Sequence, residues 1–176
     1  MSFADCLDDP MQQQMYAYWR RKCAGRTMPL RSDIDPVEIP RLLPNILISE
    51  RVIHDGRERW RYRLAGTAVV AAFGKDVTGH FLDDLVAGDY HDFIAGVRRM
   101  VCEERRALFC ESEYLSRRDV RLVAKRLLLP LTMDGARVDQ IISLLVFHFG
   151  SPRPMSIELD RTEGTTRHRG PILAEA

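Results

Sequence analysis

The stretch RYRLAGTAVVAAFGKDVTG, residues 61–79, runs from a strand-like segment through Gly-Thr into a short apolar helix. Phosphate-binding loops are built in a similar way, because a glycine turn lets the first amides of a helix face an anion. A Walker loop, however, needs GxxxxGK and then Ser or Thr ahead of the helix. Here Gly74 follows the apolar segment, and Asp76 stands where the hydroxyl residue should be. The stretch therefore predicts a helix that Thr67 caps and Gly74 ends, and it excludes a Walker loop.

Predicted strands flank this stretch on both sides, and Asp-Gly turn signals at 55–56 and 134–135 join neighbouring strands as hairpins. The strands are ILISERVI (46–53), RWRYRL (59–64), ALFCESEYL (107–115), VRLVAKRLLLPLTM (120–133) and RVDQIISLLVFHF (137–149). Strands joined by hairpins form an antiparallel sheet, and helices grouped between them must cover one of its faces. A parallel nucleotide-binding sheet needs alternating strands and helices. The order along this chain therefore predicts an α+β domain.

Length and composition indicate one globular domain with tails. The chain has 176 residues, 45% of them hydrophobic and 29% charged, with a net charge of +1. This balance gives no general attraction to nucleic acid or to an anionic membrane. No apolar run reaches the ~20 residues that span a bilayer, and the acidic start MSFADCLDDP is not a secretory signal. We therefore expect a cytoplasmic protein with no nucleic-acid or membrane partner and with reduced cysteines.

The chain divides into three regions. Residues 1–25 contain a predicted helix in which Met15 and Trp19 recur at helical spacing. Residues 26–149 form the predicted core, and residues 150–176, rich in Pro, Gly, Thr and charge, are predicted to be a flexible tail. Both faces of the last predicted strand are apolar, but the inserted helices can cover only one of them. The second face therefore needs another cover. We expect the N-terminal helix to cover the other face, alone or shared across a two-fold interface, and we predict a homodimer.

Five short segments carry a resemblance to a known family. They are YW (18–19), PLRSDIDPVEIPRLLPNI (29–46), RYRLAGT (61–67), FGKDVTG (73–79) and LLLPL (127–131). In this order they resemble the single-domain PAS proteins of alphaproteobacteria, a family often described as a PAS-like domain of unknown function. The resemblance implies a five-stranded antiparallel sheet of order 2-1-5-4-3, with the helical insertion closing a cavity over one face. It also implies sensing or signalling rather than catalysis, and it supplies no ligand and no site residues.

Motifs for cofactors and for catalysis are scarce. The Asn-Cys-Arg motif of a flavin photosensor is absent. His91, near the start of the long helix, is a conceivable haem ligand, but a solvent-exposed histidine is the more common role at such a position. No GxSxG elbow and no HExxH motif is present. The cofactor is therefore unknown. We expect no enzymatic activity, with a small α+β isomerase as the catalytic alternative.

Two non-catalytic functions remain open for a domain of this kind. The first is a sensor whose pocket binds a small, largely apolar ligand or a protein partner. The second is a protein-interaction adaptor whose core is filled by its own side chains. The sequence contains no kinase, cyclase or helix-turn-helix pattern, so we expect any signal to leave through a partner protein.

Side-chain alternation predicts which residues would face a pocket under the helical insertion. The ligand-binding candidates are Tyr62, Phe73, Phe93, Val97, Leu108, Cys110, Tyr114 and Arg126. In the strand 59–64, alternation also places Leu64 on the buried face with Tyr62, and the three arginines on the solvated face.

Arg126 admits two interpretations. Glu111 or Glu113 can pair with Arg121 or Lys125 across the hairpin on the outer face, and the same parity turns Arg126 inward. An inward arginine is costly without a polar partner, so a bulge near Arg126 could instead return it to solvent. If Arg126 does face inward, it marks the polar end of an apolar cavity and selects a ligand with an acidic group.

Overall fold

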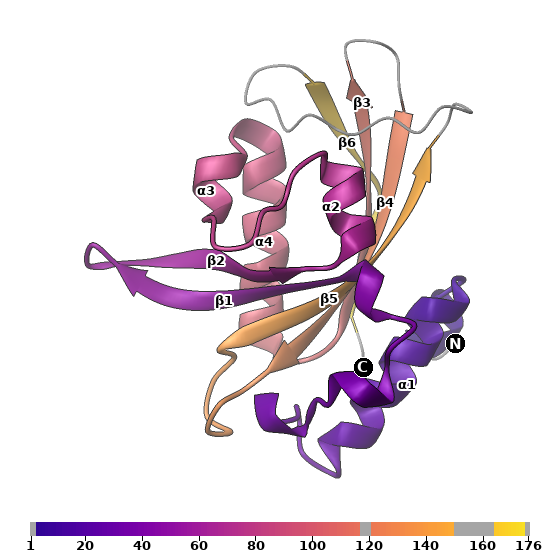
Figure 1. The fold of residues 1–176 in the computed structure, drawn as a ribbon, viewed down its shortest axis with the longest axis vertical. Coiled ribbons are helices and arrows are strands. Elements are labelled where there is room, and N and C mark those ends of the chain that lie inside the picture. The colour runs from indigo at the N-terminus through magenta and orange to yellow at the C-terminus, as the bar shows by residue number, and fades with distance from the viewer. Residues whose placement is uncertain (1–2, 117–120, 150–163, 175–176) are drawn as a thin grey trace.

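The computed structural model describes residues 3–116, 121–149 and 164–174, with side chains described for 3–113 and 122–148. Its centre is a six-stranded antiparallel sheet of order β2-β1-β5-β4-β3-β6 (Figure 1). The strands are β1 Ile46–His54, β2 Arg57–Ala65, β3 Leu108–Ser116, β4 Arg121–Leu131, β5 Gln140–Phe149 and β6 Gly164–Ala174. The first five follow the order 2-1-5-4-3, so the predicted PAS-like α+β fold is confirmed.

The sixth strand corrects one prediction. Residues 164–174 are expected to belong to a flexible tail, but they form β6 and pair antiparallel with β3 at the edge of the sheet. Pro171 is tolerated there because an edge strand leaves one side of its backbone without a partner strand. Residues 150–163 lie outside the described part of the chain.

Three helices between β2 and β3 cover one face of the sheet, which we call the inner face. They are α2 Thr67–Phe73, α3 Leu82–Leu85 and α4 Gly88–Glu104 (Figure 1). Their apolar side chains form one cluster with the strands, including Val69, Phe73 and Ile94 against Leu47 and Leu145. In the described residues no helix is long and apolar enough to cross a membrane.

The opening stretch folds nearly as predicted. α2 ends at Gly74, whose φ of 72° is left-handed. The N-cap, however, is Gly66, and Thr67 is the first residue of the helix rather than its cap. Gly66 lies where β2 ends, and its N–H donates to the carbonyl oxygen of Ile46 at 2.8 Å. The turn therefore joins β1, β2 and α2 tightly.

Helix α1, Pro10–Cys23, packs on the opposite, outer face against β4 and β5 (Figure 1). Asp9 caps it by accepting from the backbone N–H groups of Met11 and Gln12. The Trp19 indole is fully buried, and its Nε1 donates to the carbonyl oxygen of Pro130 at 2.9 Å. The predicted covering of the outer face by the N-terminal helix is thus confirmed within a single chain.

A proline-rich connector follows α1 and continues across the outer face. It contains three short 3₁₀ turns, Arg31–Asp33, Pro36–Glu38 and Leu43–Asn45. Asp35 caps the middle turn, and the Tyr18 hydroxyl accepts from the N–H of Asp35 at 2.9 Å. Asp35 and Pro36 therefore begin an ordered turn in the connector.

A β-bulge near the end of β2 corrects the predicted orientation of Leu64. Ile48 pairs with Leu64 whereas its neighbour Ser49 pairs with Tyr62, so Arg63 is an additional residue in β2. The extra residue reverses the alternation after Tyr62. Tyr62 faces the inner cluster, and Leu64 turns to the outer face, where it is 43% exposed.

Candidate functional site

A small interior cavity lies between the inner face of the sheet and helices α2 and α4. Its volume is about 20 Å³, about the space of one water molecule. It is lined by Leu47, Tyr62, Phe73, Tyr90, Ile94, Val97, Arg98, Arg126, Leu128, Ser143 and Leu145. The lining thus combines an apolar majority with two arginines and two phenols.

The structure brings four of the eight predicted candidates to this interior cavity: Tyr62, Phe73, Val97 and Arg126. Leu108 and Cys110 are buried but do not line it, and Phe93 is half-buried beside both apolar clusters. The side chain of Tyr114 lies outside the described residues. A cavity therefore lies under the helical insertion, lined by half of the candidates, but it is far smaller than an open ligand pocket.

Arg126 faces inward. Its side chain is 7% exposed, and the pairing of β4 with β3 and β5 runs through it without a register shift, so the bulge interpretation is wrong. Its Nη1 donates to Ser112 Oγ at 2.6 Å and to the carbonyl oxygen of Ala124 at 3.2 Å. Its Nη2 donates to the hydroxyl of Tyr90 at 2.9 Å. As predicted from the parity, Lys125 faces the other way and lies 3.6 Å from Glu111.

A second arginine, Arg98 of α4, reaches the same cavity and is 4% exposed. Its Nη2 donates to the Tyr62 hydroxyl at 3.3 Å, and its Nη1 donates to the carbonyl oxygen of Ile94 at 3.4 Å. Its guanidinium also lies 5.4 Å from the centroid of the Tyr62 ring and 5.9 Å from that of Trp60. Nε of Arg98 is buried and has no hydrogen-bond partner among the described residues.

The charged groups that line the cavity are two arginines, so its lining carries positive charge. Neither Arg98 nor Arg126 forms an ion pair with a carboxylate of the described residues. Burial raises the pKa of the Tyr62 phenol and raises the pKa of the nearby Cys110 thiol to about 11, while both arginines lower these pKa values. Both groups therefore stay neutral at physiological pH, so neither of them supplies a negative charge beside the two guanidinium groups.

The sequence contains a signal for Arg98 that residue-type expectations obscure. In α4, the buried positions Ile94, Val97, Arg98 and Val101 follow the i, i+3, i+4, i+7 spacing of one helix face. An arginine at a position of that apolar stripe is unusual and indicates a special role. Tyr90, one turn before Ile94, lies on the same face and is a second cavity residue absent from the predicted candidates.

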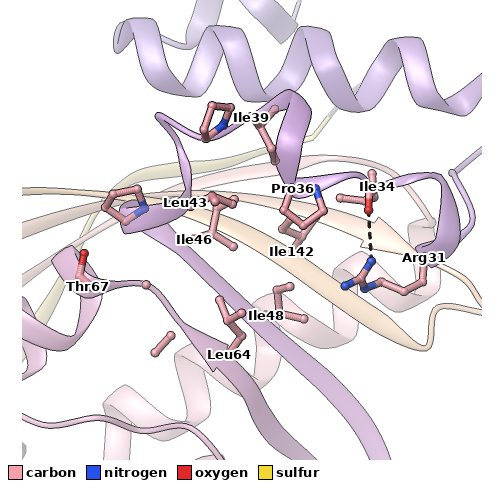
Figure 2. Close-up of a pocket in the computed structure, with 14 residues that line it drawn as sticks. Arg31, Ile34, Pro36, Ile39, Leu43, Ile46, Ile48, Leu64, Thr67 and Ile142 are labelled. Atoms are coloured by element: carbon pink, nitrogen blue, oxygen red, sulfur yellow. Dashed lines mark hydrogen bonds between the residues drawn. The ribbon is translucent and has the colours of Figure 1, made fainter.

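A second hollow, which we call the outer groove, opens between the connector and the outer face of the sheet. Figure 2 shows it with Ile34 and Ile39 of the connector on one side and Ile48, Leu64 and Ile142 of the strands on the other. Its volume is about 440 Å³, and its lining is almost entirely apolar. None of the eight predicted candidates lines the outer groove.

His91, the conceivable haem ligand, does not reach the interior cavity. It lines a separate hollow of about 520 Å³ between the β1–β2 hairpin and helices α3 and α4. Its Nδ1 lies 3.1 Å from Asp92 Oδ1. Within the described residues no group of three His, Cys, Asp or Glu side chains is arranged to hold a metal ion.

The sheet order, the helical insertion over one face and the cavity beneath it together define a PAS-type sensor or interaction fold. A family model described as PAS domain matches residues 7–146 of the chain. The protein therefore belongs to the PAS domain family. No curated protein and no solved structure matches it.

Proposed function

We propose that this PAS domain is a sensor that binds a small ligand in the interior cavity and passes the change to a partner protein. The observation that carries this proposal is the burial of Arg98 and Arg126 without an ion pair among the described residues. Replacing buried charges by apolar residues of similar size often stabilises a protein, so packing alone gives no reason for them. A ligand that interacts with these groups gives that reason.

The size of the cavity dictates how such a sensor would work. A cavity of about 20 Å³ holds about one water molecule, so an organic ligand must displace part of the wall. Helix α4 supplies Arg98 to the cavity and the exposed Arg99 to the surface. A ligand that displaces α4 would therefore change a surface that a partner can contact, because the helix moves as one packed unit.

We assign no catalytic activity to the domain. The polar groups of the cavity are hydrogen-bond donors, and the raised pKa of the nearby Cys110 thiol keeps it neutral and a poor nucleophile. We also propose that the protein resides in the cytoplasm. We further propose a homodimer formed through the outer face, where α1 and the outer groove meet solvent.

The alternative is a protein-interaction adaptor that binds no ligand. Its supporting observation is the same small volume, because a cavity of about 20 Å³ is close to a filled core. In that case partner contacts would use the outer surface, and mutations of the cavity would leave them unchanged.

Native mass spectrometry of the purified full chain separates the two functions. We expect the parent to carry an additional small-molecule mass. Val97→Met adds side-chain volume to the cavity wall and should lose that mass, while the matched outer-groove variant Leu64→Met should keep it. A parent without additional mass, and without hydrogen-exchange changes in α4 on addition of cell metabolite extract, would contradict the sensor and favour the adaptor.

A further inference from the structure

We propose that Arg98 and Arg126 form an anion-binding pair that selects a small organic acid, with an oxyanion head group between the two guanidinium groups and an apolar body against the helices. This inference rests on the proposed sensor function and names its ligand class. The head group can be a carboxylate or a phosphate monoester, since a guanidinium binds either of them through paired N–H donors.

The first argument is charge. Two guanidinium groups line a cavity that the described residues furnish with no carboxylate. Taking an arginine out of water is unfavourable unless a counter-charge or strong hydrogen bonds offset the loss. Their partners here are neutral hydroxyl and carbonyl oxygens. An anion between them would supply the missing compensation for both.

The second argument is the direction of the hydrogen bonds. The hydroxyls of Tyr62 and Tyr90 each accept from an arginine, so each phenol still has its own proton to donate. The raised pKa of Tyr62 keeps that proton in place at physiological pH. Nε of Arg98 is a further buried donor without a partner among the described residues. The cavity therefore offers several donors to a ligand, which suits an acceptor-only group such as an oxyanion.

The third argument concerns the rest of the ligand. Beyond the polar groups, the cavity wall is formed by Leu47, Phe73, Ile94, Val97, Leu128 and Leu145. This wall favours an apolar body over a free inorganic ion.

The bonds of the two arginines also indicate which of them can move. The bonds of Arg98, at 3.3 and 3.4 Å, lie beyond the usual range, whereas Arg126 is held by three bonds of 2.6, 2.9 and 3.2 Å. Arg126 is thus the fixed half of the pair, and Arg98 on α4 is the half that a ligand can reposition.

Calorimetric titration of the full chain with three probes tests the inference. The probes are sodium benzoate, phenyl phosphate and the neutral analogue benzyl alcohol. We expect at least one of the two acids to bind, with benzyl alcohol binding much more weakly. Arg98→Met and Arg126→Met should each weaken the binding of that acid by about tenfold to a hundredfold, because each removes a charge-assisted hydrogen bond to it. Arg99→Met removes the same charge from an exposed position of α4 and should change nothing.

Thermal unfolding without added acid controls for folding. Both cavity variants should unfold at the parent temperature or above it, because each removes an uncompensated buried charge. Binding of benzoate alone or of phenyl phosphate alone supports the inference and identifies the head group. The acid selectivity is overturned if benzyl alcohol binds as tightly as the acids and the two variants, Arg98→Met and Arg126→Met, bind the acids like the parent. That result leaves a small-ligand sensor intact. No binding by any probe overturns the inference, whereas a neutral molecule found by native mass spectrometry would still support the sensor.

Discussion

Gly66 shows how much one missing side chain decides in this fold. A Cβ built on Gly66 would lie 2.6 Å from the carbonyl carbon of Pro44 and closer still to the carbonyl oxygens of Leu43 and Pro44. These are backbone atoms of the connector, so they cannot rotate away as a flexible side chain can. The turn from β2 into α2 therefore exists only because glycine lets the two backbones touch.

We predict that Gly66→Ala destabilises the protein by about 2–4 kcal/mol, because the connector must shift to admit the methyl group. Gly96→Ala is the matched control. Gly96 lies inside α4 with open space around the added methyl, so alanine there should stabilise by up to about 1 kcal/mol. Urea unfolding of both variants measures the difference. Equal stability of Gly66→Ala and the parent would show that the connector yields easily.

For single residues, the sequence predicts which face of a regular strand a side chain occupies, but it does not predict where that regularity is broken. The inward position of Arg126 follows from strand alternation, and the structure agrees. The same alternation predicts the wrong face for Leu64, because the extra residue Arg63 reverses it. A single sequence carries no sign of that bulge. Arg98 was missed because arginine is expected at the surface, although its helical spacing places it among buried residues.

The packing of α1 on β4 depends on Trp19 and Pro130. β4 is an interior strand, where proline is normally excluded because it lacks an N–H for the ladder. The pairing with β3 ends at Leu128, so Pro130 lies beyond the neighbour that would have needed that donor. Its carbonyl oxygen accepts from Trp19 instead. The helix thus satisfies a backbone acceptor that the sheet leaves unpaired on that side.

We predict that Trp19→Phe costs about 1–3 kcal/mol, since it leaves the Pro130 oxygen buried without its donor. Trp19→Ala should cost about 3–5 kcal/mol, because it also leaves a large cavity under α1. Trp60→Phe is the control: Trp60 is half-buried, and its indole has no hydrogen bond to the described residues. If urea unfolding finds Trp19→Phe no more destabilising than Trp60→Phe, the indole bond contributes little.

Element order and pairing are largely predictable, and the final strand is not. Hairpin signals at Asp55-Gly56 and Asp134-Gly135 identify neighbouring strands, and the PAS resemblance supplies their order in the sheet. The segment 164–174 contains two glycines and a proline and lacks a period-two pattern, so local sequence gives it no strand character. It pairs along β3 over its length, and such long-range pairing is invisible to local propensity.

For the molecule as a whole, the outer face bears on assembly. α1 covers β4 and β5, but the outer groove keeps Leu43 and Leu64 partly exposed beside Ile48 and Ile142. Apolar surface of this kind, bordered by the proline-rich connector, is typical of an interface. A second copy that brings the same face would cover both grooves by two-fold symmetry.

We predict a homodimer at micromolar concentration in sedimentation velocity. Leu64→Asp places a charge in the outer groove and should shift the protein toward monomer. Ile53→Asp introduces the same charge at an exposed apolar position of the β1–β2 hairpin that does not line the groove, and it should leave the dimer unchanged. A monomeric parent at these concentrations would refute the dimer. An equal response of both variants would place the interface elsewhere.

The two tryptophans of the chain lie on opposite faces of the sheet, and this gives the protein two built-in optical reporters. Trp19 is buried between α1 and the sheet, so its fluorescence emission should be blue-shifted and should respond only when that helix detaches. Trp60 lies 5.9 Å from the guanidinium of Arg98, so its emission should respond to any change in the position of that cation. Trp19→Phe and Trp60→Phe are therefore single-tryptophan proteins, one for each face. Together they can time events on the two sides of one sheet separately, without an attached dye.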